Sequence, residues 1–442
     1  MAFNVKEYMQ FLDNCKTERL CVTEIIKKAS ASGYKDIKKV KKISKGDKVY
    51  FNQMGKTVVL FNVGTESIEN GMNILGAHLD SPRLDVKQKP VYESDGIVYL
   101  NTHYYGGIKK YQWLTMPLSL IGVVVLSDGK IVNVNVGEKE DDPVFFITDI
   151  LPHIAQKQMA KTADEIVEAE KLDLVIGCSN GIKSEEKNSN KTRILSILKE
   201  KYGIEEDDFI SAELEVVPSG KSRYVGFDKN LIIGYGQDDR VCAFASLVAM
   251  LDHINSERTS CCILTDKEEI GSTGATGMNS NLLLNAVTEL VYRMGCENPE
   301  IIIRRALANS YMLSSDVNSA YDPLNPDLYD KDNSSFLSGG VVFNKYTGSR
   351  GKYGASDANA EFLAKIRGIM KDENGEIVFQ TAELAKVDIG GGGTIAKYCA
   401  LYGMQVIDCG VPVHSMHAPW ELTSVFDIVQ AYRCYLSFLS MK

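Results

Sequence analysis

Short apolar segments of the strand type alternate with longer helical segments at both ends of this 442-residue chain, but not in its middle. The clearest segments of the strand type are residues 73–77, 260–265, 310–313 and 404–407. Residues 241–251 are apolar on all sides, which is typical of a helix buried between layers. Alternation of this kind predicts a layered α/β domain.

The stretch between residues 96 and 230 has a different pattern. Val132, Val134 and Val136 alternate with asparagines, as in a half-buried antiparallel strand. Asp128 and Gly129 separate this segment from the β-prone residues 123–126, which indicates a hairpin. We therefore expect residues 1–95 and 231–442 to form one discontinuous α/β domain, interrupted by a β-rich insertion at 96–230.

Composition excludes several classes of protein. The chain has 49 Lys and Arg against 58 Asp and Glu, a net charge of −9, which argues against nucleic acid or an anionic membrane as the main partner. Its ten cysteines are scattered and none has CxxC spacing, so a thiolate metal site or a disulfide scaffold is not expected. The first residues lack the apolar stretch of a signal peptide. A reduced, cytoplasmic protein is the expectation.

Residues of the metal-binding type occur where predicted strands end or a helix begins. They lie in five places: His78 with Asp80, Asp238 with Asp239, Glu268 with Glu269, Asp316, and His417. Sites in open α/β sheets gather beyond the carboxyl ends of the strands. Taken singly, each motif has a plain structural reading, such as a helix cap for the Asp pair or a solvated face for the Glu pair. Their combination predicts a shared site.

Imidazole and carboxylate ligands without thiolates suit two divalent cations such as zinc, cobalt or manganese. Two such ions about 3.5–4 Å apart can lower the pKa of a shared water and polarise a carbonyl group. A carboxylate that is not a ligand must then accept the proton from the water. The adjacent Glu268 and Glu269 can divide the roles of base and ligand.

The motifs ILGAHLDSPRLDVK, GYGQDDRVCAFASL, DKEEIGSTGATG, SSDVNSA, KVDIGGGGTIA and VHSMHAPWE, in this order, resemble the aspartyl aminopeptidase family of metallopeptidases. The resemblance covers nearly the whole chain and implies a metallopeptidase domain with a mixed central sheet. It also implies site roles. His78 and Asp316 would bind one metal ion and Asp238 would bridge both ions. Glu269 and His417 would bind the other ion, Asp80 would orient His78, and Glu268 would be the general base. His414 is a rival of His417.

The resemblance implies less about substrate contacts. Lys345 would hold an acidic side chain of the first residue, with Tyr353 nearby, and Gly392 lies in a glycine run that could approach the substrate or simply form a tight turn. The segments after Asp316 and after Lys345 depart from the family's DMAHAxHP and NxxQRYA patterns. The resemblance implies an acidic first residue, and these departures make a neutral one the alternative.

The family resemblance further implies that the insertion mediates assembly of a homo-oligomer, a dodecamer in this family. His153, in Pro152-His153-Ile154-Ala155, would then stabilise the oxyanion in a neighbouring subunit. The expected partner is a peptide substrate. Two rivals are a non-catalytic shell or scaffold of the same fold and a two-metal deacylase.

Overall fold

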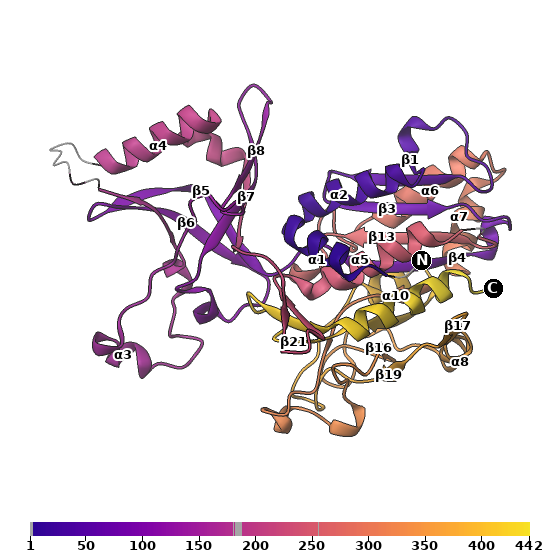
Figure 1. Cartoon of the computed structure of the whole chain (residues 1–442). Coiled ribbons are helices and arrows are strands. Elements are labelled where there is room, and N and C mark those ends of the chain that lie inside the picture. The colour runs from indigo at the N-terminus through magenta and orange to yellow at the C-terminus, as the bar shows by residue number, and fades with distance from the viewer. Residues whose placement is uncertain (1–2, 180, 182–187, 255) are drawn as a thin grey trace. The chain divides into compact units, whose positions relative to one another are not determined.

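The computed structural model describes residues 3–179, 181, 188–254 and 256–442 (Figure 1). These residues form two compact units. The first comprises residues 1–80, 222–416 and 421–442, and the second comprises 81–221 and 417–420. Among the described residues, no helix is both long enough and apolar enough to cross a membrane.

The second unit begins earlier and ends earlier than the predicted insertion at 96–230. It begins earlier because strand β5 (Arg83–Ser94) pairs with β6 (Ile97–Tyr105) and β10 (Ala212–Pro218) of the same unit. It ends earlier because β11 (Arg223–Val225) pairs with β12 (Leu231–Gly234) of the first unit. Strand pairing decides both boundaries, and local composition does not reveal which strands pair.

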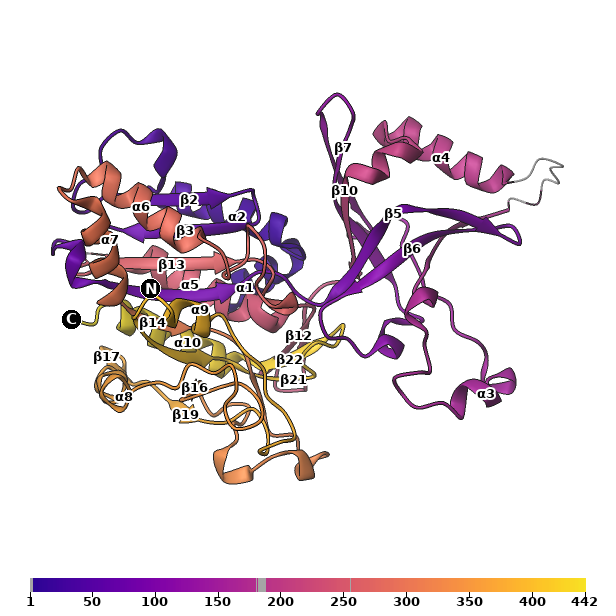
Figure 2. The ribbon, with the colours of Figure 1, turned by 180° about the vertical axis from the view of Figure 1, so that it is seen from behind.

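The first unit contains a nine-stranded mixed sheet (Figure 2). In spatial order its strands are β1 (Lys35–Asp36), β2 (Lys48–Gln53), β3 (Thr57–Asn62), β13 (Thr259–Thr265), β4 (Met72–His78), β14 (Tyr311–Ser314), β20 (Gln405–Gly410), β16 (Val341–Asn344) and β19 (Phe379–Thr381). The four neighbouring strands β13, β4, β14 and β20 are parallel to one another, whereas β3 and β16 run antiparallel to this central group. The mixed α/β fold predicted from the sequence is confirmed.

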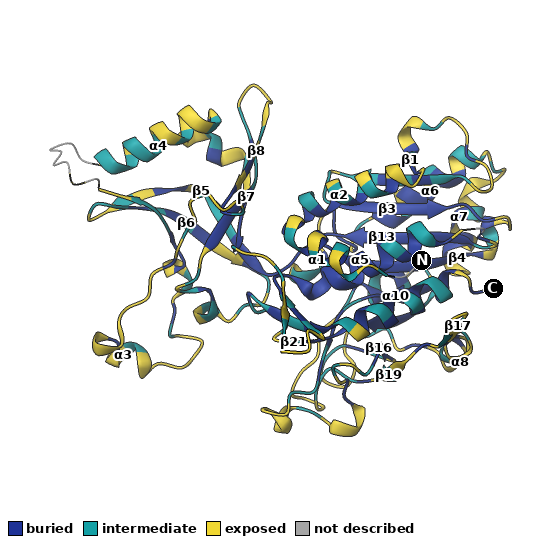
Figure 3. Cartoon of the chain, in the orientation of Figure 1, coloured by how far each residue is buried: buried dark blue, intermediate teal, exposed yellow. Residues whose placement is uncertain are grey.

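Helices cover both faces of this sheet, as Figures 1 and 2 show from opposite sides. On β3, Val58 and Leu60 contribute to the core on one face, and Val59 and Phe61 to the core on the other. One face is covered by α1 (Val5–Asn14), α2 (Glu18–Ala31), α5 (Gln237–Asp252) and α10 (Val425–Leu439), and the other by α6 (Leu282–Met294), α7 (Pro299–Ala308) and α9 (Ala396–Ala400). The predicted buried helix at 241–251 is confirmed as part of α5, nearly all of which is buried (Figure 3).

Smaller elements complete the described part of the first unit. A five-stranded sheet has the order β11, β12, β22 (Glu421–Ser424), β21 (Pro412–His414) and β15 (Asn318–Ser319). Strands β17 (Lys371–Asp372) and β18 (Gly375–Glu376) form a short hairpin next to α8 (Ala360–Gly368) in the sequence. Strand β12 leads directly into α5, so this sheet sets where the helix begins.

The second unit is built on a six-stranded antiparallel sheet. Its order is β8 (Ile131–Val136), β7 (Leu118–Val125), β10, β5, β6 and β9 (Leu174–Cys178), and its helices are α3 (Gln156–Met159) and α4 (Ser189–Tyr202). The hairpin predicted around Asp128 and Gly129 is present, because β7 and β8 pair in antiparallel register through Val124 and Val132. The β-rich character of this stretch therefore follows from its sequence.

Candidate active site

Three parallel strands deliver polar residues to one edge of the nine-stranded sheet. His78 is the last residue of β4, the glutamate pair opens a short 3₁₀ turn just after β13, and Asp316 lies two residues beyond β14. Strands β13 and β14 both pair with β4 in parallel register, so their carboxyl ends lie side by side. This arrangement brings together residues that are far apart in the sequence.

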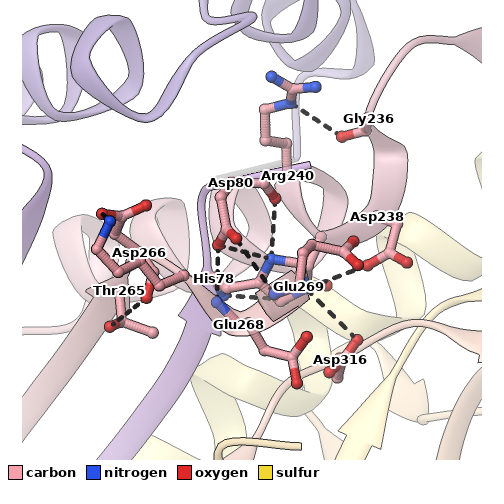
Figure 4. Close-up of polar contacts among 12 residues, drawn as sticks. His78, Asp80, Gly236, Asp238, Arg240, Thr265, Asp266, Glu268, Glu269 and Asp316 are labelled. Atoms are coloured by element: carbon pink, nitrogen blue, oxygen red, sulfur yellow. Dashed lines mark hydrogen bonds and ion pairs between the residues drawn. The ribbon is translucent and has the colours of Figure 1, made fainter. Parts of the chain in front are cut away.

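The imidazole of His78 lies at the centre of the cluster (Figure 4). Its Nε2 atom is 3.2 Å from Oδ1 of Asp238 and 3.8 Å from Oδ1 of Asp316. Two sets of possible metal-binding atoms, each within 4.8 Å of one another, share this histidine. One set is His78, Asp239 and Asp316, and the other is His78, Asp238 and Glu269.

The Asp238–Asp239 pair lies at the start of α5, and the peptide bond between them is cis. The backbone N–H of Asp238 donates to the carboxylate of Glu421, at 2.9 Å. The carboxylate of Asp239 accepts from the backbone N–H of His78, at 3.2 Å. Asp239 therefore does more than cap a helix. Glu421 was missed at the sequence level, although it ends the quoted VHSMHAPWE motif.

Asp80 connects the histidine to the glutamate pair. Its Oδ1 and Oδ2 atoms accept hydrogen bonds from the backbone N–H groups of Glu268 and Glu269, at 3.1 and 3.2 Å. The Nδ1 atom of His78 lies 3.0 Å from the Asp80 carbonyl oxygen and 3.4 Å from its carboxylate. An Nδ1 proton held in this way would leave the Nε2 atom, which faces Asp238 and Asp316, to lose its proton and bind a metal ion.

The electrostatics of the cluster call for a cation. Burial raises the pKa of Asp239 and of Asp316 well above the usual range of a carboxyl group. Burial alone would lower the pKa of His78, but hydrogen bonds to Asp238 and Asp80 raise it well above its ordinary value. Several carboxylates gathered out of water are costly unless a positive charge compensates them.

The donor set fits a divalent metal such as zinc. All the donors are carboxylate oxygens or an imidazole nitrogen, which zinc accepts. The buried Oδ1 atom of Asp239 has no hydrogen-bond partner among the described residues. The nearby Cys242 is fully buried, and burial raises the pKa of its thiol well above the normal range, so it stays protonated beside Asp239. The cluster therefore offers oxygen and nitrogen ligands and no thiolate.

The two candidate histidines of the C-terminal motif have different positions. His417 belongs to the second unit, where its Nδ1 atom lies 2.9 Å from the carbonyl oxygen of Gly107. His414 belongs to the first unit, and its Nε2 atom lies 3.0 Å from the carbonyl oxygen of Tyr321. Neither belongs to the two donor sets found among the described residues. The assignment of His417 therefore stays a proposal that rests on its motif.

The expected substrate residues lie on loops or at the surface. Lys345 follows β16 and forms an ion pair with Asp357, and Tyr353 is largely exposed. The carbonyl oxygen of Gly392 accepts from the backbone N–H of Gly348, at 2.6 Å. His153 is exposed in the second unit, in the 3₁₀ turn Pro152–Ile154. No described contact joins these residues to the His78 cluster.

Residues 11–439 match the family described as aminopeptidase I zinc metalloprotease (M18). The chain belongs to the M18 family. It is similar to a probable M18 family aminopeptidase 1 of Clostridium acetobutylicum, with 52% identity over 98% of this chain and 93% of that protein. The corresponding protein of Thermotoga maritima is 42% identical over 98% of this chain and 95% of that protein. The enzyme is thus an M18 aminopeptidase, a zinc metalloprotease, and the predicted recognition is confirmed.

Solved structures agree with this M18 fold. The crystal structure of an M18 aminopeptidase from Thermotoga maritima superposes with a TM-score of 0.95 at 41% identity, covering 99% of this chain and 96% of that one. Aminopeptidase I from Clostridium acetobutylicum gives a TM-score of 0.91 at 50% identity, covering 98% and 94%. The non-catalytic shell is therefore not favoured, because the relatives are named as aminopeptidases and the buried donor cluster is present.

Proposed function

We propose that this M18 aminopeptidase binds two divalent metal ions, with zinc favoured, and removes single residues from peptide N-termini. The observation that carries the proposal is the buried His78 imidazole shared by two sets of donors. Following the motif order, His78 and Asp316 would hold one ion and Glu269 and His417 the other, with Asp238 between them. Asp239, which lies in the donor set with Asp316, is a further candidate ligand.

Two bound ions would supply Lewis acidity and a water of lowered pKa. The protein's own contribution would be proton transfer and orientation. Glu268 is half-buried and belongs to neither donor set, so its carboxylate can accept a proton from the attacking water and deliver it to the leaving amine. Asp80 would hold Glu268 through the backbone and would hold the imidazole of His78 in one tautomer.

The first residue of the substrate would be acidic if Lys345 is available to it. Lys345 is about half exposed, and its ammonium group is paired with Asp357, which also binds Lys352 at 3.0 Å. An acidic substrate side chain would compete with Asp357 for Lys345. This observation favours a second candidate, in which Lys345 stays paired with Asp357 and the enzyme prefers a neutral first residue.

A panel of peptides with different first residues, assayed with zinc, cobalt and manganese in turn, tests both candidates. Under the acidic hypothesis, Lys345→Met should lower kcat/KM for Asp and Glu peptides by about tenfold, the effect of one lost charged hydrogen bond, and spare Leu peptides. Asp357→Asn should raise kcat/KM for peptides with an acidic first residue. Lys365→Met, on α8, is the matched control. Faster wild-type hydrolysis of neutral peptides, unchanged by Lys345→Met, would establish the neutral preference. N-acyl peptides test the deacylase rival.

We also propose that the enzyme is a homo-oligomer and that the second unit mediates its assembly. The segment around His153 exposes the apolar side chains of Ile150, Leu151 and Ile154, with 48%, 52% and 66% of their surface accessible. Neighbouring apolar side chains exposed in this way are typical of an interface. The structurally similar mApe1 of S. cerevisiae is a dodecamer, although at 21% identity it supports the fold alone.

Assembly and activity can be separated with variants of the exposed segment. His153→Ala should remain assembled by analytical ultracentrifugation but turn over slowly, because a donor to the oxyanion would be lost. Lys157→Ala, on the neighbouring α3, is the control and should keep full activity. A fully active dilute monomer would exclude the shared site.

A cytoplasmic location is a further proposal, supported by ten cysteines that are all free thiols.

A further inference from the structure

A buried carboxylate occupies an inner strand of the nine-stranded sheet, outside the metal cluster. Asp408 lies on β20, where it is opposite Ser314 of β14 on one side and Asn344 of β16 on the other. Only 2% of its surface is accessible. Burial raises the pKa of Asp408 to about 6, although the nearby hydroxyl groups of Thr394, Ser314 and Thr347 lower it in part. A carboxylate is a costly residue at such a position unless it holds specific partners.

The hydroxyl group that donates to Asp408 comes from a loop. The Thr394 hydroxyl donates to Oδ1 of Asp408, at 2.6 Å, and accepts from the backbone N–H of Ala396, at 3.2 Å. Thr394 follows the glycine segment 390–393, and Ala396 is the first residue of α9. Thr347 is buried in the loop that follows β16, close enough to Asp408 to lower the pKa of its carboxyl group. Asp408 thus holds the base of the 390–394 loop against β20, with Thr347 of the other loop nearby.

The two loops also meet directly through their backbones. The N–H of Gly348 donates to the carbonyl oxygen of Gly392, at 2.6 Å. A Cβ atom on Gly391, which has φ of +140°, would lie 1.8 Å from the carbonyl oxygen of Gly348, so only glycine permits this approach. Between the loops lies an open cavity of about 200 Å³, lined by residues 346–352 and several residues of 383–391.

We propose that Asp408 is a positioning residue that sets the width of this cavity through Thr394, and that the cavity receives the side chain of the first residue of the peptide. The second part rests on the proposed aminopeptidase function. Asp408 is not one of the metal donors, and it acts by fixing the base of the 390–394 loop, which contacts the other loop through Gly392 and Gly348, to the central sheet. Its removal should therefore affect peptide binding more than the chemical step.

The test compares Thr394→Val and Asp408→Asn with Thr394→Ser and a control. Asp427→Asn is the control, because Asp427 is also buried in the first unit but accepts from Ser338 and Gly340, each at 2.7 Å. For every variant we would measure KM and kcat over the peptide panel. Hydrogen–deuterium exchange at residues 346–352 and 383–394 gives a readout that does not depend on activity.

Thr394→Val and Asp408→Asn should raise KM by about tenfold, keep kcat within about twofold, and speed exchange in both loops. Thr394→Ser should restore all three values, and Asp427→Asn should lower thermal stability without changing KM. Unchanged exchange in Thr394→Val, or a fall in kcat with KM constant, would overturn the proposal, and Thr394→Val remains decisive if Asp408→Asn does not fold. If the wild type hydrolyses no peptide, the aminopeptidase function fails, and the exchange data still decide the positioning role.

Discussion

The carboxylate of Asp80 accepts a hydrogen bond from the backbone N–H of Glu268, with 3.1 Å between Oδ1 and the nitrogen. The two residues are 188 positions apart in the sequence. They meet because β4 and β13 are parallel neighbours and both end at this edge of the sheet. The orientation of the proposed base is thus coupled to the residue that orients His78.

We predict that Asp80→Asn lowers kcat/KM by about 10- to 100-fold, the usual effect of losing a partner that orients a metal ligand. The amide NH₂ group of the asparagine would face one of the two backbone N–H groups, of Glu268 or Glu269, that now donate to the carboxylate. Steady-state kinetics and metal analysis on the same preparation check this prediction. Asp85→Asn, in the second unit, is the control. Wild-type kinetics in Asp80→Asn would show that this contact does not orient the site.

Glu268→Gln and Glu269→Gln should differ in what they lose. Glu268→Gln should keep both metal ions and lose most of its turnover, because an amide cannot accept the proton. Glu269→Gln should lose affinity for one ion, because Glu269 belongs to a donor set and Glu268 does not. Metal content measured by mass spectrometry, together with the rates, separates the two roles. Full activity in Glu268→Gln would exclude it as the base.

Gly410 should be intolerant of any side chain, because β20 ends against the backbone of Asp316. A Cβ atom at Gly410 would lie 1.6 Å from the carbonyl oxygen of Asp316. We predict that Gly410→Ala displaces Asp316, weakens metal binding and destabilises the fold by about 1–3 kcal/mol, as overpacking does. The control is Gly368→Ala, where an added Cβ meets nothing within 4 Å. Calorimetry with and without zinc checks both variants, and equal stability would refute the prediction.

His253 should make the enzyme sensitive to acid in a defined pH window. It is buried at the end of α5, and burial lowers the pKa of its imidazole to about 4. The unfolded chain then binds more protons than the folded one between about pH 6.5 and 4. The neutral His253 ring makes its full contribution to the free energy of unfolding above pH 6.5. This contribution falls by up to about 3 kcal/mol as the pH falls towards 4.

The variant His253→Gln should therefore show a shallower loss of unfolding free energy between pH 6.5 and 4 than the wild type does. Denaturant titrations at several pH values measure this slope. His103→Gln, which changes an exposed ring that contacts the Tyr104 carbonyl, should retain the wild-type slope. Parallel curves for the wild type and His253→Gln would contradict the assignment.

Much of the site could be predicted from the sequence, because it depends on local pattern. His78 and Asp316 follow short apolar strands, and such strands in an alternating α/β chain are parallel and end together. Asp238 begins a helix that its apolar residues identify as buried. These are relationships between a residue and its own element, which the sequence carries directly.

Only the tertiary structure decided the contacts between elements that are distant in the sequence. Glu421 supports Asp238 because β22 pairs with β12, and Thr394 reaches Asp408 because α9, which follows Thr394, packs against β20. The second unit also begins earlier than the predicted residue 96, because β5 pairs with β6 of that unit. The sequence by itself indicated several central strands, the buried helix and the candidate metal donors of this enzyme. Their partners depended on the folded sheet order, since strand pairing is set by long-range packing that no local pattern encodes.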